Sequence, residues 1–236
     1  MKIGIFTDSH YSSQEITCGN RYNRQSLRKI KEALSAFREQ SCELVLCLGD
    51  LIDHEGDHEQ EIINLKQVSE VFHEMISDGS MKIMCMMGNH DAFTFTSDEF
   101  YHLLGEEFRP ERTEISHKAL FFPDTCYFAD GRHYLPGDTD WTDTFLPDAE
   151  NLHRELNAVP GEAVIFLHQN IDPRIREDHC LANAAKIRQI LEESGKVRTV
   201  YQGHYHPGHE TEHNGIRYVT FPAMCEGENV WTIIEI

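Results

Sequence analysis

The sequence predicts an α/β protein built from layered sheets. Short apolar runs of strand character alternate with segments in which apolar residues recur at a helical period. The order strand, helix, strand repeats along the chain, which is typical of sheets covered by helices. The 236 residues are enough for one sizeable core, and no repeat, linker or low-complexity segment divides them. We therefore expect a single domain over residues 1–236.

Five strands and three helices carry this prediction. The strand-like runs are residues 2–8, 43–50, 82–89, 162–168 and 198–204. In residues 24–40, Leu27, Ile30, Leu34 and Phe37 fall on one helical face. Residues 62–75 show the same period, and a third helix over 184–191 ends at Ser194–Gly195, a plausible C-cap. Four further segments read as strands with short turns: residues 118–124 and 125–138 in the middle third, where no helix is expected, and later residues 215–223 and 229–236. We expect these four to form the second half of a sandwich.

Composition restricts the partners. The chain has 40 Asp+Glu against 21 Lys+Arg, a formal charge of −19. Such a surface repels duplex nucleic acid and anionic membranes, whereas a small phosphorylated substrate can bind where divalent cations reverse the local field. No signal peptide or membrane span of about 18 apolar residues is expected. Seven cysteines without a Cys-x-x-Cys pair are interpreted as buried, reduced thiols, and the predicted location is the cytoplasm.

The chemistry gathers where the five predicted strands end. Each run ends in a residue able to bind a metal, and a histidine follows three of the runs within two residues; in chain order these residues are Asp8, His10, Asp50, Asn89, His90, His168, His204 and His206. Ligands of α/β sheets bind beyond the carboxyl ends of strands, so these residues can converge on one site. Glycines precede three of them, and a residue without Cβ permits a sharp exit and close approach to a metal. Carboxylate, imidazole and amide donors suit Mn, Fe, Zn or Co, and one bridging Asp suits a dinuclear centre.

Five motifs resemble those of the calcineurin-like metallophosphoesterase superfamily. They are Asp8-x-His10, Gly49-Asp50-x-x-Asp53, Gly88-Asn89-His90-Asp91, His168 and Gly203-His204-x-His206, in the order that the superfamily has them. The resemblance implies a four-layer αββα sandwich with two central mixed sheets. It also implies two divalent or trivalent metal ions, of Mn, Fe or Zn, and a hydroxide between them that attacks phosphorus.

The resemblance also implies roles for the residues of these motifs. One metal would be held by Asp8, His10, Asp50 and His206, and the other by Asp50, Asn89, His168 and His204. His90 would stabilise the phosphoryl charge and protonate the leaving oxygen, and Asp53 would hold the His90 ring. Asp91 is expected to be a loop or capping carboxylate. Most histidines outside these motifs, His179 among them, are expected on the surface, but His54 and His209 lie near the motifs and could line the pocket.

Within the superfamily, the chain is most similar to class III cyclic-nucleotide phosphodiesterases and manganese-dependent ADP-ribose/CDP-alcohol diphosphatases. The likeness rests on Arg21-Tyr22-x-Arg24 before the first helix and on the tail with Pro222-Ala223-Met224 and Glu226. Arg21 and Arg24 are candidates for binding a second phosphate or a ribose beside the metal site, and the alternative is that they lie in a solvated first turn of a helix. His54 is a further candidate because it directly follows Asp53. The predicted function is cleavage of a phosphodiester or diphosphate bond in a small nucleotide-like substrate.

Three alternative functions are retained. They are a phosphomonoesterase, a phosphoprotein phosphatase and a non-catalytic scaffold with the same fold. Protein phosphatases of the superfamily carry Asp-Arg-Gly where this chain has Asp53-His54-Glu55, which argues against that class. Scaffolds tend to lose ligands or the catalytic histidine, whereas this chain retains both.

Overall fold

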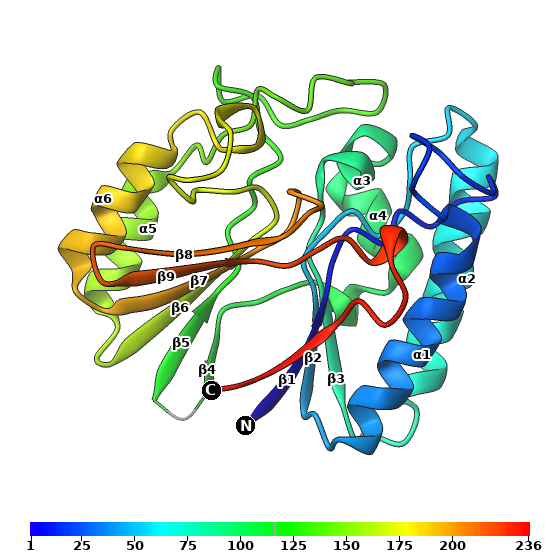
Figure 1. Cartoon of the computed structure of the whole chain (residues 1–236), viewed down its shortest axis with the longest axis horizontal. Helices are drawn as coiled ribbons and strands as arrows, with labels where there is room; N and C mark the ends of the chain where they lie inside the picture. Colours follow the sequence, from blue (N-terminus) through cyan, green and yellow to red (C-terminus); the bar gives the residue numbers. More distant parts are fainter. Residues whose placement is uncertain (116) are drawn as a thin grey trace.

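Two mixed sheets form the centre of the molecule in the computed structural model, which describes residues 1–115 and 117–236 (Figure 1). The first sheet has the strand order β10 (Thr232–Glu235), β1 (Lys2–Phe6), β2 (Leu44–Cys47) and β3 (Lys82–Cys85). The second has the order β4 (Thr113–Ile115), β5 (Lys118–Phe121), β6 (Glu162–Leu167), β7 (Val197–Gln202), β9 (Ile216–Thr220) and β8 (His209–His213). β1, β2 and β3 run parallel, as do β5, β6, β7 and β9, and antiparallel β10, β4 and β8 complete the edges.

Helices cover the outer face of each sheet. The longer helices are α1 (Ser26–Glu39), α2 (His58–Ile76), α4 (Ser97–Leu104), α5 (Ala149–Ala158) and α6 (Ala184–Ser194), and α3 (Asn89–Thr94) is a short turn of helix. In Figure 1, α1 and α2 lie outside the first sheet, and α5 and α6 lie outside the second. The α6 helix ends at Gly195 in the left-handed conformation, as its C-cap prediction required.

Three apolar cores separate the four layers. One lies between the first sheet and its helices and includes Leu34, Phe37 and Phe72. Another lies between the second sheet and α5 and α6. The third joins the inner faces of the two sheets, where Ile5 and Leu46 pack in one cluster with Phe166. The alternation of side chains along each strand supplies both faces of each sheet with apolar residues. The αββα architecture implied by the resemblance is confirmed.

All five predicted strands and all three predicted helices are present, but the weaker segments needed correction. Residues 125–138 form no strand; they make a loop with isolated bridges such as Tyr127 to His133. The segment 229–236 contains β10, which pairs with β1 in the first sheet and not with the second half of the sandwich. Helix α5 lies where no helix was expected. Its apolar residues Leu152 and Leu156 are only one turn apart, so its periodic signal is short.

The topology brings strand ends of both sheets together. The carboxyl ends of β1, β2 and β3 open toward the same edge of the sandwich as those of β6 and β7 (Figure 1). The loop after β1 is tied to the loop after β2, since the amides of Asp8 and His10 donate to Gly49 O and Asp50 O at 3.0 and 2.9 Å. In the described part of the chain, no helix is both long enough and apolar enough to cross a bilayer.

Candidate metal centre

The loops after five strands bring seven polar side chains to one point between the sheets. They are Asp8, His10, Asp50, Asn89, His168, His204 and His206. Six of them are buried as residues and His206 is only partly exposed. Ligand atoms of Asp8, His10 and Asp50 lie within 4.8 Å of one another, as do those of Asp50, His168 and His204. Asp50 is the residue that the two groups share.

The two carboxylate oxygens of Asp50 make different contacts. Oδ1 accepts the backbone N–H of His90 at 2.8 Å, which fixes the carboxylate. Oδ2 lies 3.5 Å from Nε2 of His10 and 3.3 Å from Nε2 of His168. A single oxygen therefore faces imidazoles of both groups, one from each sheet.

Three of the imidazoles have their outer nitrogen engaged by an acceptor. Nδ1 of His168 lies 2.8 Å from Leu48 O, Nδ1 of His206 lies 2.5 Å from Oε1 of Glu226, and Nδ1 of His10 lies 3.3 Å from Oδ1 of Asp53. An acceptor at Nδ1 favours the tautomer that carries its proton there. The Nε2 lone pairs then face the centre of the cluster, as metal ligands do.

A cation resolves contacts that are otherwise unfavourable. Nε2 of His10 and Nε2 of His206 are 3.2 Å apart, so their lone pairs oppose each other when both protons are on Nδ1. Two imidazoles bound to one tetrahedral ion at about 2.0–2.1 Å are about 3.3 Å apart. Asp8 Oδ1 and His204 Nε2 are also buried, and neither has a hydrogen-bond partner among the described residues. Such buried groups are costly unless paired with a ligand. The donor set therefore fits divalent metal ions.

The backbone at the site is held in a conformation that few residues adopt. Asp8, His10, Asp50 and His204 have φ angles of 52°, 42°, 51° and 64°. Non-glycine residues in this left-handed region cost of order 1–3 kcal/mol each and concentrate at functional sites. These four residues lie in the loops that follow β1, β2 and β7, and their backbone conformation directs their side chains toward the cluster.

The glycines before three of the motifs permit close approach, as predicted. A Cβ on Gly88 would lie 2.2 Å from Oδ1 of Asp50, and a Cβ on Gly203 would lie 2.2 Å from Oγ1 of Thr7. The same atom on Gly49 would lie 2.6 Å from Nδ1 of His168. No side chain larger than hydrogen fits at these positions without displacing a member of the cluster.

Burial and charge set the protonation of the cluster. Burial, together with repulsion from His90, lowers the pKa of His10 to about 4. Burial and the neighbouring His168 lower the pKa of His204 well below its ordinary value. Burial also opposes protonation of His168, but attraction to the Asp50 carboxylate outweighs it and raises the pKa of this ring to about 10. A metal at His168 must therefore displace a proton from the ring.

His90 and Asp53 lie beside the cluster. Nδ1 of His90 is 2.7 Å from Oδ1 of Asp53. Oδ2 of Asp53 accepts hydrogen bonds from Thr17 and Asn23 at 3.1 and 2.9 Å. Burial works against ionisation of Asp53, but its hydrogen bonds with His10 and His90 hold the pKa of the carboxyl well below its usual range.

Asp91 has the structural role that was expected for it. Its carboxylate accepts the backbone N–H groups of Gly88, Leu51 and Ile52 at 2.9, 3.2 and 3.0 Å. These bonds cap the first turn of α3 and tie it to the loop after β2.

A cleft of about 310 Å³ opens over the cluster. Its walls include residues of the cluster, His90 and side chains from several loops: Cys18, Arg21, Asp50, Asn89, His90, Trp141, His179, His204, His206 and Pro207. The Trp141 ring lies 5.8 Å from the His204 ring and 5.0 Å from the His179 ring, centroid to centroid. One wall of the cleft is thus aromatic, and the cluster forms its floor.

The model of the calcineurin-like phosphoesterase family matches residues 1–208, a span that contains all seven clustered residues. The chain belongs to the calcineurin-like phosphoesterase family. It is a metal-dependent phosphoesterase, and its Asp and His cluster is where this family's dinuclear centre is expected. No curated protein matches the chain by sequence.

Solved structures of calcineurin-like fold resemble the chain over nearly its whole length. A dimetal phosphatase from Danio rerio has a TM-score of 0.79 at 17% identity, covering 98% of this chain and 91% of that one. An archaeal phosphodiesterase has a TM-score of 0.51 at 14% identity, covering 100% and 93%. GAP50, described as the anchor in the inner membrane complex of Plasmodium, has a TM-score of 0.57 at 12% identity, covering 93% and 70%. At such identities the likeness shows a shared fold.

The three predicted substrate-binding residues of this phosphoesterase lie in different places. Arg21 lines the cleft, and its Nη1 is 3.7 Å from Oδ1 of Asp53. Arg24 donates to Ser13 O and pairs with Glu15 at 3.1 Å, outside the cleft lining. His54 is engaged by Glu61 and Thr94 at 3.2 and 3.3 Å and also lies outside that lining.

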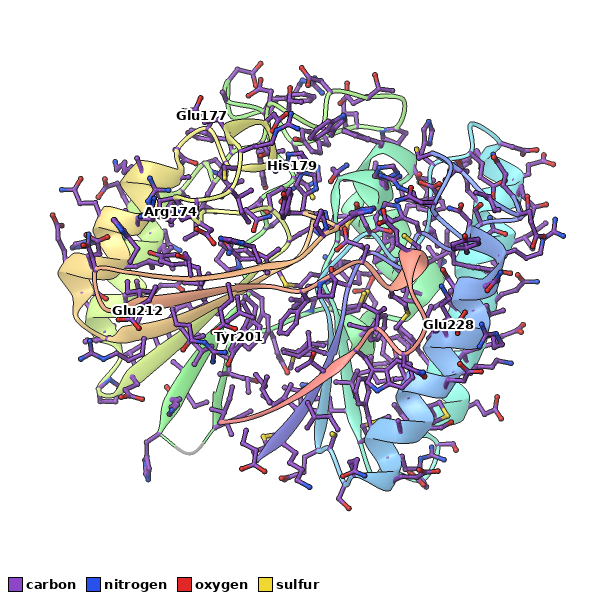
Figure 2. The ribbon with its side chains drawn as sticks, in the orientation of Figure 1. Arg174, Glu177, His179, Tyr201, Glu212 and Glu228 are labelled. Atoms are coloured by element: carbon purple, nitrogen blue, oxygen red, sulfur yellow. The ribbon has the colours of Figure 1, made fainter. Side chains whose placement is uncertain are left out.

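Three residues of the site were missed in the sequence. His179 was expected on the surface, but it lies toward the inside of the loop between β6 and α6, while Arg174 and Glu177 of the same loop lie farther out (Figure 2). Trp141 comes from the loop before α5 and carries no motif. Glu226 was noticed only as part of the tail, although it holds Nδ1 of His206. A cue for Glu226 existed, because metal-binding histidines usually have such an acceptor.

Proposed function

We propose that this phosphoesterase hydrolyses a phosphodiester or diphosphate bond in a small, nucleotide-like substrate. The observation that carries the proposal is the combination, in one cleft, of the Asp and His cluster with a guanidinium and an aromatic wall. Arg21 offers a charge for a second phosphate, and Trp141 offers a face for a base.

The proposed ligands follow the two groups of the cluster. Asp8, His10, Asp50 and His206 would hold one ion. Asp50, Asn89, His168 and His204 would hold the other; Nε2 of His168 lies 3.1 Å from Oδ1 of Asn89, which supports a shared ion. Two ions of this kind stabilise charge on phosphoryl oxygens and activate water at neutral pH.

His90 is proposed as the general acid that protonates the leaving oxygen. It lines the cleft, and its backbone N–H is fixed by Asp50. Burial opposes its protonation, but the Asp50 and Asp53 carboxylates outweigh this and raise the pKa of the ring. An imidazolium that forms an ion pair with Asp53 on its Nδ1 side can donate from Nε2 to a phosphoryl or leaving-group oxygen. Asp53 acts through this ring and is proposed as a positioning residue.

A reducing compartment is proposed as the place of action. All seven cysteines are free thiols, which agrees with the cytoplasmic location expected from the sequence.

The test is a substrate panel with the manganese-loaded enzyme. Nucleotide diphosphate diesters, cyclic nucleotides, nucleoside monophosphates and phosphoserine peptides are compared by kcat/KM. The proposal expects the first two classes to exceed the last two. An enzyme that ignores every nucleotide but cleaves other phosphoesters contradicts the substrate assignment, and a preference for monoesters contradicts the bond assignment.

A further inference from the structure

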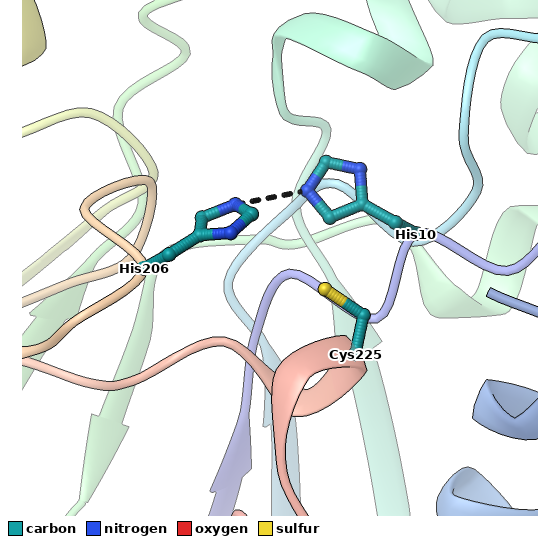
Figure 3. A group of neighbouring side chains, drawn as sticks. All are labelled: His10, His206 and Cys225. Atoms are coloured by element: carbon teal, nitrogen blue, oxygen red, sulfur yellow. Dashed lines mark hydrogen bonds between the residues drawn. The ribbon is translucent and has the colours of Figure 1, made fainter. Parts of the chain in front are cut away.

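A thiol reaches the cluster from the opposite end of the chain. Cys225 lies in a short 3-10 turn, Met224–Glu226, and is fully buried. Its sulfur and the ring nitrogens of His10 and His206 lie within 4.8 Å of one another. Figure 3 shows the sulfur directed toward the gap between the two imidazoles. Two ligands of one ion, with bonds of about 2.0–2.3 Å, are at most about 4.6 Å apart, so atoms within 4.8 Å of one another are near the limit at which they can share an ion.

The turn that carries Cys225 is held from several sides. Its backbone N–H donates to Asp8 O at 3.1 Å. Its carbonyl accepts from the Tyr22 amide at 3.0 Å and from Nζ of buried Lys29 at 3.1 Å. The next residue, Glu226, binds Nδ1 of His206. Because the backbone of Cys225 is tied to Asp8 and, through Glu226, to His206, its sulfur is restricted to the few positions that staggered rotamers allow beside the cluster.

The hydrogen bonding of this thiol differs from that of four other buried thiols, though not from that of buried Cys42, whose sulfur likewise has no acceptor among the described residues. The sulfurs of Cys47, Cys85, Cys126 and Cys180 each have a backbone carbonyl acceptor. Among the described residues, no such acceptor is found for the sulfur of Cys225.

A second, independent observation points to a ligand at the same place. Oδ1 of Asp8 is fully buried and has no hydrogen-bond partner among the described residues. It lies 3.5 Å from Nε2 of His206 and 3.9 Å from Nε2 of His10. An unpartnered carboxylate oxygen therefore faces the same two imidazoles that the Cys225 sulfur approaches.

We propose that Cys225 is a ligand of the metal ion held by Asp8, His10 and His206. The inference rests on the proposed two-metal centre and adds a donor that the sequence motifs do not contain. On ligation the sulfur–metal bond forms, the S–H bond breaks, and its proton leaves to solvent. A thiolate at one of two ion sites makes them unequal, because sulfur favours Zn, Fe and Co over Mn and Mg. The ion site that contains Cys225 selects a thiophilic metal. The second ion site, which contains Asn89 and has no thiolate, accepts a harder metal.

Cobalt(II) substitution tests the proposal without relying on activity. Cobalt bound to nitrogen and oxygen ligands gives visible ligand-field bands, and a sulfur ligand adds a charge-transfer band in the near ultraviolet. We expect both in the wild-type protein. In Cys225→Ser the charge-transfer band is lost while the visible bands remain. The matched control is Cys18→Ser, since Cys18 is the other cysteine near the cluster and is exposed; it should keep both bands.

Each result decides between the two proposals. A charge-transfer band that persists in Cys225→Ser, or is missing from the wild type while visible bands are present, overturns the thiolate ligand and leaves the two-metal centre standing. A protein that takes up no cobalt overturns the two-metal centre itself. If Cys225→Ser does not fold, X-ray absorption of zinc-loaded Cys18→Ser replaces it. One sulfur per two zinc ions at about 2.3 Å is expected, and a shell of only nitrogen and oxygen at about 2.0–2.2 Å contradicts the proposal.

Discussion

Oδ1 of Asp53 lies 2.7 Å from Nδ1 of His90 and 3.3 Å from Nδ1 of His10. One carboxylate therefore orients the proposed acid and a proposed metal ligand at the same time. Asp53 in turn is held by Asn23 and Thr17, so the orientation of both rings depends on the loop between β1 and α1. The first prediction follows from this double contact.

Asp53→Asn should lower kcat by about 10–100-fold, as loss of the carboxylate partner of a functional imidazole commonly does. The amide keeps the size of the side chain but removes the charge that favours the imidazolium form of His90. The pH dependence of kcat should shift, with the alkaline limb moved to lower pH, because His90 must be protonated to act and its pKa falls without Asp53. Asp98→Asn, at a fully exposed carboxylate, is the control. An unchanged pH profile with reduced metal content would assign Asp53 to His10 alone.

His90→Ala should reduce the rate by about 10²–10⁴-fold with the metal content unchanged, since general acid catalysis contributes on that order. His102→Ala, on the exposed face of α4, is the matched control and should have wild-type activity. A non-catalytic scaffold would be indifferent to the change. Equal rates for the two variants would show that His90 has no part in the reaction.

Trp141→Ala should weaken nucleotide binding. Stacking of a base on an aromatic side chain is worth about 1–3 kcal/mol, so KM for the preferred nucleotide should rise about 5–150-fold. Hydrolysis of a small aryl phosphate should change little. Trp231→Ala is matched in residue type, since Trp231 packs on the core between the first sheet and its helices. If Trp141→Ala changes KM for the nucleotide and KM for the aryl phosphate by the same factor, the aromatic wall of the cleft does not bind a base.

Gly88→Ala should lose bound metal and about 1–3 kcal/mol of unfolding free energy, the usual cost of overpacking. The new methyl would lie 2.2 Å from Oδ1 of Asp50 and 2.7 Å from Cε1 of His168. Gly131→Ala is the control: a Cβ there meets no atom within 4 Å, and only its φ of +87° is unfavourable. That variant should be somewhat less stable but keep its metal. Metal analysis and denaturant unfolding measure both effects; a metal-loaded Gly88→Ala protein would contradict the prediction.

The parts of the fold that were predictable are those with a local signal. Strands β1, β2, β3 and β6 are largely apolar runs buried on both faces, β7 is buried over its second half, and α1, α2 and α6 repeat an apolar period over several turns. Nothing local distinguishes β10 from a strand of the second sheet. Its place beside β1 depends on pairing Lys2 with Glu235 across nearly the whole chain.

The residues of the site also differ in how far the sequence predicts them. The clustered residues follow strands directly, so strand order and parallel direction bring them together. Trp141, His179 and Cys225 come from loops and a short turn whose course is set by tertiary contacts, such as the bond from the Cys225 amide to Asp8 O. The interpretation of Cys225 as an ordinary buried thiol explained its burial but not its neighbours. Arg24 and Arg21 are close in sequence, yet Ser13 and Glu15 engage only Arg24.

The central claim is a dinuclear phosphoesterase bridged by Asp50, and one measurement tests it most directly. Hydrolysis of bis-p-nitrophenyl phosphate and p-nitrophenyl phosphate is followed with Mn added or chelated, beside metal analysis, for the wild type and Asp50→Asn. The account predicts two ions per chain, turnover that chelation abolishes and Mn restores, and loss of both metal and turnover in Asp50→Asn. Turnover that survives chelation, or an Asp50→Asn protein that keeps two ions and full activity, would contradict it.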